Sequence, residues 1–182
     1  MTVVVRARTA ADAGGLLAAL RPVHERDGYP LYATHLTTGW LYDGITDAWV
    51  AADGDRLLGH IALAHDERGS HVTRFFVAVD ARGSGAGSAL LSTVEAWADE
   101  RAVELTLDVV EHNTDARALY ERHGWRHVDT VTATWVREEP PWPQAFVYRR
   151  DAQSRSTSAS SSSPQPMTEP AGNAIAESSG VA

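Results

Sequence analysis

The chain has 182 residues and contains neither cysteine nor lysine. Without cysteine, neither disulfide bonds nor thiolate chemistry is available. Without lysine, the Gly-Lys-[Ser/Thr] ending of a Walker A phosphate loop cannot occur. No apolar stretch approaches the roughly 18 residues of a membrane span, and residues 1–6 have no basic region before an apolar run. We therefore expect a cytoplasmic protein with no membrane partner.

Basic residues are also in deficit, because the formal net charge is −8. A general nucleic-acid binder would show a basic patch, so we expect no nucleic-acid partner. An acidic balance suits a cationic or amine-bearing partner, although it is also an ordinary way to stay soluble. The charge alone does not decide between these two interpretations.

The chain length allows one folded domain with a sizeable core. From about Ala152 the composition changes to serine with proline, glutamine, glutamate, glycine and alanine. Such a segment buries too little apolar surface to offset the entropy lost on ordering. We predict one domain over residues 1–151 and a disordered tail over residues 152–182.

Hydrophobic periodicity and turn residues predict an α+β fold. The pattern predicts strands over residues 3–8, 47–52, 57–65, 73–77, 104–110, 126–133 and 145–149, and helices over residues 9–26, 85–101 and 113–124, with a short helix and loop over residues 29–44. This order predicts a mixed, mostly antiparallel sheet of six to seven strands, flanked by helices, with one parallel pair at its centre.

A basic, glycine-rich turn over residues 82–88 joins an apolar strand to an amphipathic helix. Glycines let the backbone N–H groups of such a turn point at one centre. The start of the helix adds free N–H groups and the positive end of its dipole. We expect the turn to hold a phosphate or pyrophosphate, with Arg82 at the rim.

Two other interpretations of this turn stay open. Gly83, Gly85 and Gly87 come close to the dinucleotide fingerprint G-x-G-x-x-G, and Asp108 lies where a ribose-binding acid would follow. However, the third glycine of the fingerprint would fall at Ser88. The turn could also be a purely structural one that needs positive φ.

Residues 108–125 resemble the second signature of the GCN5-related N-acetyltransferases. In that family an Asn at a strand end precedes a short helix that bears a Tyr, and a Gly and an aromatic begin the next strand. Asn113, Tyr120, Gly124 and Trp125 match this pattern, with Trp where Phe or Tyr is commoner. Residues 82–87 match the first signature, Arg/Gln-x-x-Gly-x-Gly/Ala. Both signatures occur in the family's order and spacing.

The resemblance implies an enzyme that moves an acetyl group from acetyl-CoA, as co-substrate, to a primary amine of a small molecule or peptide. It also implies that the central parallel strands splay apart and that pantetheine pairs with the strand ahead of the turn. Asn113 would bond pantetheine, cap the following helix, or do both. The residues implied in holding the coenzyme are Phe75, Phe76 and Val77 through their backbone, Arg82, Gly83, Ser84, Gly85, Ala86, Gly87, Ser88 and Asn113.

The catalytic roles follow from the chemistry of acyl transfer to an amine. A free backbone N–H near Val77 is the expected donor to the oxyanion. Tyr120 resembles the family's tyrosine acid for the departing thiolate. Asp108, Glu111 or a chain of waters would take the proton from the amine, and each carboxylate could equally be a solvated or capping acid. Without cysteine, the amine would attack directly in a ternary complex.

The acceptor side is less specific in the sequence. Tyr29, His35, Trp40 and Tyr42 could wall the acceptor pocket or form an apolar staple over the core. No histidine spacing indicates a metal site, and His60 is expected to be an interior residue.

Two rival functions are a non-catalytic acyl-CoA-binding module and an NAD-type oxidoreductase. Binding of acetyl-CoA but not NAD would remove the second rival. Domains of the resembled family often pair, so a homodimer is one expected assembly.

Overall fold

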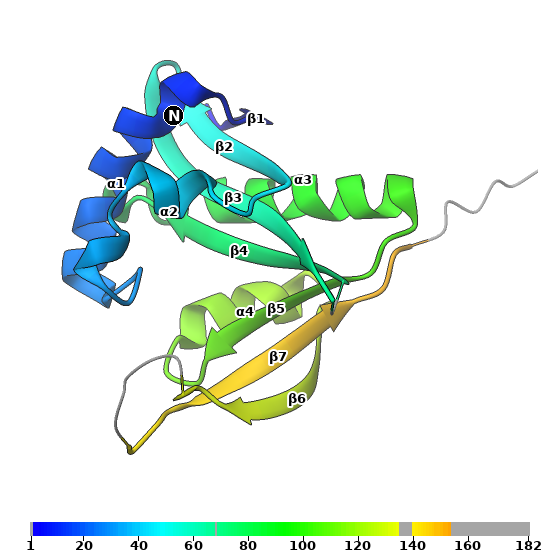
Figure 1. The fold of residues 1–182 in the computed structure, drawn as a ribbon. Helices are drawn as coiled ribbons and strands as arrows, with labels where there is room; N and C mark the ends of the chain where they lie inside the picture. The colour runs from blue at the N-terminus through cyan, green and yellow to red at the C-terminus, as the bar shows by residue number, and fades with distance from the viewer. Residues whose placement is uncertain (1, 68, 135–139, 154–182) are drawn as a thin grey trace, which may run out of the picture.

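The computed structural model describes residues 2–67, 69–134 and 140–153, and seven strands of this part of the chain form one sheet in the order β1-β2-β3-β4-β5-β7-β6 (Figure 1). The strands are β1 (Val4–Ala7), β2 (Asp47–Asp53), β3 (Arg56–Asp66), β4 (Gly69–Val77), β5 (Leu105–Val110), β6 (Arg126–Thr132) and β7 (Gln144–Arg150). β4 and β5 pair in parallel, and the other described neighbours pair antiparallel. The predicted α+β class and mixed sheet are confirmed.

Helices cover both faces of the sheet. They are η1 (Ala10–Asp12), α1 (Ala13–Asp27), η2 (Ala33–His35), α2 (Thr38–Tyr42), η3 (Val79–Ala81), α3 (Ala86–Arg101) and α4 (Thr114–Arg122). Figure 1 shows α1 and α2 in front of the sheet and α3 and α4 behind it. One buried cluster contains Leu16, Leu20, Val23, Leu41, Val50 and Phe76, and the other contains Leu90, Leu91, Val94, Leu105, Leu107 and Tyr120 among others. The sheet therefore has a hydrophobic core on each side.

The parallel pair separates almost as soon as it forms. Its ladder joins Ser70 to Leu105 and His71 to Thr106, although β4 continues to Val77. Figure 1 shows the two strands diverging beyond this point. Backbone groups on the facing edges of both strands are then left without the partners a sheet would supply. This confirms the predicted splay.

β4 also carries a bulge where it pairs with β3. The register runs from His60 opposite Phe76 to Ala62 opposite Thr73, so Arg74 and Phe75 share one position on β3. Arg74 has φ +49°, a left-handed conformation that side chains other than glycine rarely adopt. The strand begins at Gly69, four residues before the predicted start. Gly69 and Ser70 have low strand propensity, but they pair with the end of β3 and so extend the strand.

Among the described residues, no helix has the length and apolar character needed to cross a membrane. The predicted tail, apart from residues 152–153, lies outside the described part of the chain.

The start of the first helical segment gives a stability prediction. Asp12 is 7% exposed and accepts hydrogen bonds from the Thr9 backbone N–H at 2.7 Å and from Arg6 at 2.6 Å. The Arg6 hydrogen bond holds the pKa of Asp12 well below its usual range. A depressed carboxyl pKa contributes stability above the unfolded pKa of about 4 and loses it as the pH falls.

Asp12→Asn should lower the free energy of unfolding by about 1 kcal/mol at neutral pH. The gap to wild type should shrink when denaturant titrations are repeated below about pH 4. Asp55→Asn, at an exposed hairpin turn, is the matched control and should change stability by less than about 0.5 kcal/mol. A gap that is constant with pH would contradict this account.

Candidate active site

The glycine turn presents backbone N–H groups at the start of α3. Gly83 and Gly85 have φ of +75° and +88°, and a Cβ on either would meet no atom within 4 Å. The backbone conformation, not crowding, therefore requires glycine at both positions. The Ala86 N–H donates to the Ser84 hydroxyl oxygen at 3.3 Å. Gly87 and Ser88 follow in the first helical turn, where N–H groups have no helical acceptor and can bind an anion.

Arg82 is the first residue of this turn, and its side chain is tied to α1. Its guanidinium forms a two-contact ion pair with Asp27, the last residue of α1, with one contact at 3.3 Å. Both side chains are partly exposed, so the pair contributes little stability. Its structural effect is to fix the turn against the end of α1.

The edge of β4 next to the turn includes Val77, whose backbone N–H is the one predicted as oxyanion donor. The Ala78 N–H donates to the Leu58 carbonyl on β3 at 2.8 Å. N–H directions alternate along a strand, so the Val77 N–H points to the opposite edge, toward β5. Pairing with β5 has already ended at His71. The Val77 N–H thus lies on the open edge of the splayed pair.

Tyr120 packs beside this edge on the α3 and α4 side of the sheet. Its ring centroid lies 6.2 Å from that of Phe75 and 5.9 Å from that of Tyr148, and the side chain is 7% exposed. Burial raises the pKa of Tyr120, and the nearby Tyr29 raises it further. The hydroxyl therefore keeps its proton and has it available to donate. The ring belongs to the core, and its role as the acid stays a prediction.

The turn, the strand and α4 meet around Gly87. A Cβ built on Gly87 would lie 3.4 Å from a Val77 methyl and 3.6 Å from Leu119. The Phe75 ring is 3.8 Å from the same point. Phe76, in contrast, is buried on the α1 and α2 side. The side chains of Phe75 and Phe76 are thus packing residues, as expected.

Asn113 caps α4, because its side-chain oxygen accepts from the Ala116 N–H at 3.2 Å. The two candidate bases differ in their surroundings. Leu107 and Val109 point into the core with α3, so alternation puts Asp108 on the α1 and α2 face, where it is exposed. Glu111 follows the strand and accepts from the Gln144 N–H at 3.3 Å, which ties it to β7.

Three of the four predicted acceptor-side aromatics come together. Trp40 packs edge-to-face with Tyr29 and stacks with His35, at 5.9 Å in both cases. Tyr42 lies apart from them. Its hydroxyl donates to the Thr9 carbonyl at 2.8 Å, and the Arg8 guanidinium lies 3.8 Å from its ring centroid. The structure thus assigns Tyr42 to the contact between α2 and the end of β1.

Tyr29 links the aromatic group to the strand. Burial raises the pKa of its hydroxyl, although Arg74 and the Phe75 backbone N–H act in the opposite direction. The hydroxyl of Tyr29 therefore lies near the bulge of β4 at Phe75, whose ring packs on Tyr120.

A chain of hydrogen bonds behind the turn is absent from the sequence-based prediction. The Ser88 hydroxyl lies 2.7 Å from His123 Nε2, and His123 Nδ1 lies 3.1 Å from Glu95. Glu95 is buried and also accepts from the Trp125 indole N–H at 2.7 Å. In the tautomer whose Nδ1–H donates to Glu95, Nε2 accepts from Ser88. The sequence signal that could have pointed to this chain is Glu95, a charged residue seven positions after Ser88 and on the same face of α3.

Arg74 is another residue that sequence reasoning missed, because nothing in a single sequence marks a bulge. His60 beside it is fully buried, as expected, and its Nδ1–H donates to the Arg74 carbonyl at 2.8 Å. Burial lowers the pKa of His60 to about 4, so its imidazole is neutral at pH 7.

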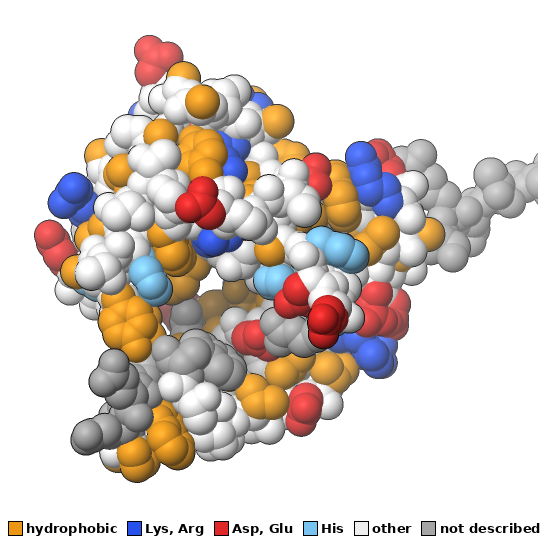
Figure 2. All heavy atoms as spheres, in the orientation of Figure 1, with side chains coloured by type: hydrophobic (Ala, Val, Ile, Leu, Met, Phe, Trp, Pro, Cys, Tyr) orange, Lys and Arg blue, Asp and Glu red, His pale blue; other side chains and the backbone are white. Residues whose placement is uncertain are grey.

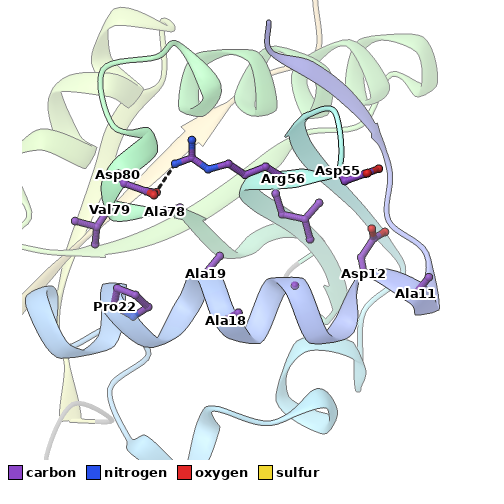
Figure 3. A pocket seen from close by; sticks show the side chains of 12 residues that line it. Ala11, Asp12, Ala18, Ala19, Pro22, Asp55, Arg56, Ala78, Val79 and Asp80 are labelled. Atoms are coloured by element: carbon purple, nitrogen blue, oxygen red, sulfur yellow. Dashed lines mark ion pairs between the residues drawn. The ribbon is translucent and has the colours of Figure 1, made fainter. Parts of the chain in front are cut away.

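A cavity of about 710 Å³ lies elsewhere, between α1 and η3 (Figure 3). Arg56 and Asp80 form an ion pair at 2.5 Å at its side. None of the predicted site residues lines it. Within the described ranges, no group of three or more His, Asp or Glu side chains could hold a metal ion.

The comparisons with known proteins agree with this geometry. The model of the acetyltransferase (GNAT) family matches residues 17–125, which span both signature segments. Arabidopsis thaliana NAA60 in complex with acetyl-CoA is similar, with TM-score 0.65 and 18% identity over 82% of this chain and 98% of that chain. A ribosomal-protein-alanine N-acetyltransferase from Brucella melitensis is similar with a TM-score of 0.66 and 23% identity, over 81% of this chain and 99% of that chain. An N-acetyltransferase from Staphylococcus aureus Mu50 is similar with a TM-score of 0.68 and 16% identity, over 83% of this chain and 99% of that chain.

Two glycine substitutions test the geometry of the turn. Gly85→Ala forces a side chain into φ +88° and should cost about 1 kcal/mol of unfolding free energy. Gly14→Ala, in α1 with open space around its Cβ, should instead stabilise the protein by about 0.5–1 kcal/mol. Denaturant titration measures both. Equal effects of the same sign would contradict the conformation assigned to residue 85.

Proposed function

Because this chain belongs to the acetyltransferase (GNAT) family, we propose that it transfers the acetyl group of acetyl-CoA to a primary amine of a small molecule or peptide. The observation that carries the proposal is the early end of the β4–β5 ladder at His71, which leaves the edge of β4 open as far as Val77, ahead of the glycine turn and the start of α3. One site thus offers an open strand edge and an anion cradle.

The residues present fit acetyl-CoA, which supplies an activated acetyl thioester when bound. The N–H groups of Gly87 and Ser88 would hold the diphosphate, since the positive end of α3 favours negative charge there. The open edge of β4 at Val77 would pair with the amide groups of pantetheine. Asn113 already satisfies one α4 N–H and has further capacity to contact the same arm.

The oxyanion donor and the acid are each one group of this chain, and the base has three candidates. The Val77 N–H would donate to the carbonyl oxygen as negative charge develops on it. The Tyr120 hydroxyl would donate its proton to the departing sulfur, and its raised pKa keeps that proton in place until the sulfur is negative. Asp108, Glu111 or water would take the proton of the attacking ammonium. The amine attacks directly, since the sequence has no cysteine to carry the acyl group.

Peptide amines are one of two acceptor classes in this proposal. Their support is the similarity to a structure named as a ribosomal-protein-alanine N-acetyltransferase. The other class is small-molecule amines. A cytoplasmic location and a homodimer stay predictions from the sequence.

A screen of acceptors tests the proposal. Free CoA is followed with acetyl-CoA and, in turn, polyamines, aminoglycosides, amino acids and peptides with free N-termini. We expect CoA release that depends on one of these amines. Tight binding of acetyl-CoA with no release above the hydrolytic background would instead support a non-catalytic acyl-CoA-binding module.

Tyr120→Phe isolates the role of the hydroxyl, because the ring and its packing are kept. We expect kcat to fall on the order of 10²-fold, with little change in the KM for acetyl-CoA. Tyr148→Phe is the matched control. It removes the hydroxyl of a neighbouring buried tyrosine, which donates to Glu121 at 2.7 Å, and should keep kcat. An unchanged kcat in Tyr120→Phe would remove Tyr120 as the acid.

Asp108→Asn and Glu111→Gln separate the candidate bases. We expect the larger loss, on the order of 10²-fold in kcat/KM, in Asp108→Asn, because Asp108 lies on the acceptor face and Glu111 is tied to β7. The loss should shrink as the pH rises toward the amine pKa of about 10, where the free amine no longer needs a base. Wild-type pH profiles in both variants would assign the proton transfer to water.

A further inference from the structure

Arg74 lies in the bulge of β4, at the junction between the two faces of the site. Its φ of +49° is strained for a residue with a side chain, and such strain is stored preferentially at functional sites. The Arg74 side chain lies against α2 on the acceptor face, where Trp40 and Asp43 contact it. The next residue, Phe75, packs against Tyr120 on the coenzyme face. Arg74 is therefore one residue away from the proposed chemistry.

The Arg74 guanidinium has fewer partners than its burial demands. It donates to the Asp43 carbonyl at 2.9 Å and lies 5.3 Å from the Trp40 ring centroid. Its Nε is buried without a hydrogen-bond partner, and no ion pair joins it to a carboxylate among residues 2–67, 69–134 and 140–153. Burial lowers the pKa of Arg74, and Tyr29 and Asp43 act in the opposite direction. A desolvated cation of this kind is a ready site for an anion.

A second half-buried arginine extends the positive charge. Arg8 donates to the Leu41 carbonyl at 2.6 Å and lies 3.1 Å from His60 Nε2. His60 donates through Nδ1 to the Arg74 carbonyl, so its Nε2 accepts from Arg8 and the ring adds no charge. Arg8 also lowers the pKa of Arg74, which shows that the two cations act on each other. The nearby Asp12 carboxylate is already paired with Arg6 at 2.6 Å.

The positive charge of Arg74 and Arg8 is opposite in sign to the net charge of −8 of the whole chain. Figure 2 shows a hollow in this face, over the region where β4 and β5 diverge, with arginine, histidine, acidic and hydrophobic side chains around its rim. A net negative protein that keeps two half-buried arginines on its acceptor face favours an acceptor with an anionic group. The same charges would lower the pKa of an ammonium group nearby and favour the reactive free amine.

We propose that Arg74 binds a carboxylate of the acceptor, so that the substrate is an amino acid or another amine that bears a carboxylate. The planar guanidinium fork matches a carboxylate with two parallel N–H bonds, and its hydrogen bond to the Asp43 backbone carbonyl leaves its charge unneutralised. This inference rests on the proposed acetyltransfer to an amine and specifies its acceptor.

The test uses matched acceptors that differ only in charge. The twenty L-amino acids and their α-carboxamides are assayed as acceptors with acetyl-CoA by CoA release. We expect kcat/KM for the best acids to exceed that of their amides by about 10- to 100-fold, the effect of a hydrogen bond to a charged group. Arg74→Gln should reduce this preference to within about threefold and leave the KM for acetyl-CoA unchanged.

Two further variants complete the design. Arg74→Lys keeps the charge without the fork and should keep part of the preference. Arg126→Gln is the control and should keep the full preference for acids over amides. Arg126 lies on β6, at the far edge of the sheet, and pairs with Asp151 at 2.5 Å. The comparison of acids with amides in the wild type does not depend on how well the variants fold.

Several results would overturn the inference. Amides accepted as well as acids by the wild type would do so. A proportional loss on both series in Arg74→Gln would assign Arg74 to holding Asp43 only. No turnover of either series, with acetyl-CoA still bound, would also remove the carboxylate acceptor while coenzyme binding stands. A wild type that fails to bind acetyl-CoA would contradict the proposed function itself.

Discussion

Two parallel strands that part after two paired positions leave a row of backbone donors and acceptors that must find other partners. In this chain the wedge between β4 and β5 is filled on one side by α4, whose Tyr120 and Leu119 pack against Phe75 and Gly87. These apolar contacts hold the strands apart, and the edge at Val77 stays open because no strand can reach it. An extended ligand with amide groups is the partner that such an edge can accept.

The bulge at Arg74 gives this open edge two different sides. An extra residue in β4 turns Arg74 toward α2 and Phe75 toward α4. In the proposed function, the coenzyme takes the face with the glycine turn and Tyr120, and the acceptor takes the face with Trp40 and Arg74. Tyr29 lies between the two faces, because the Phe75 backbone N–H and Arg74 both lower the pKa of its hydroxyl. This arrangement is compatible with the proposed direct attack through the opening between the strands.

The parts of the site that local sequence determines could be predicted. The positive φ of Gly83 and Gly85, the cap formed by Asn113 and the alternation of β5 each depend on a few neighbouring residues. The bulge could not be predicted, because it depends on how β4 registers with β3. The Ser88–His123–Glu95 chain joins residues from two helices and needs their packing to be seen. Tyr42 shared the composition of the aromatic segment but turned toward Arg8. Net charge left a cationic partner and ordinary solubility undecided, because a sum over all residues does not show where half-buried cations such as Arg8 and Arg74 lie.

Residue-resolved amide hydrogen exchange, measured with and without CoA, tests the central claim most directly. The account predicts that the Val77 amide exchanges fast in the free protein and slows strongly when CoA binds. The Ala78 amide, bonded to Leu58 at 2.8 Å, should be protected in both states. A Val77 amide that is already protected without CoA, or that keeps exchanging fast while CoA is bound, would contradict the account.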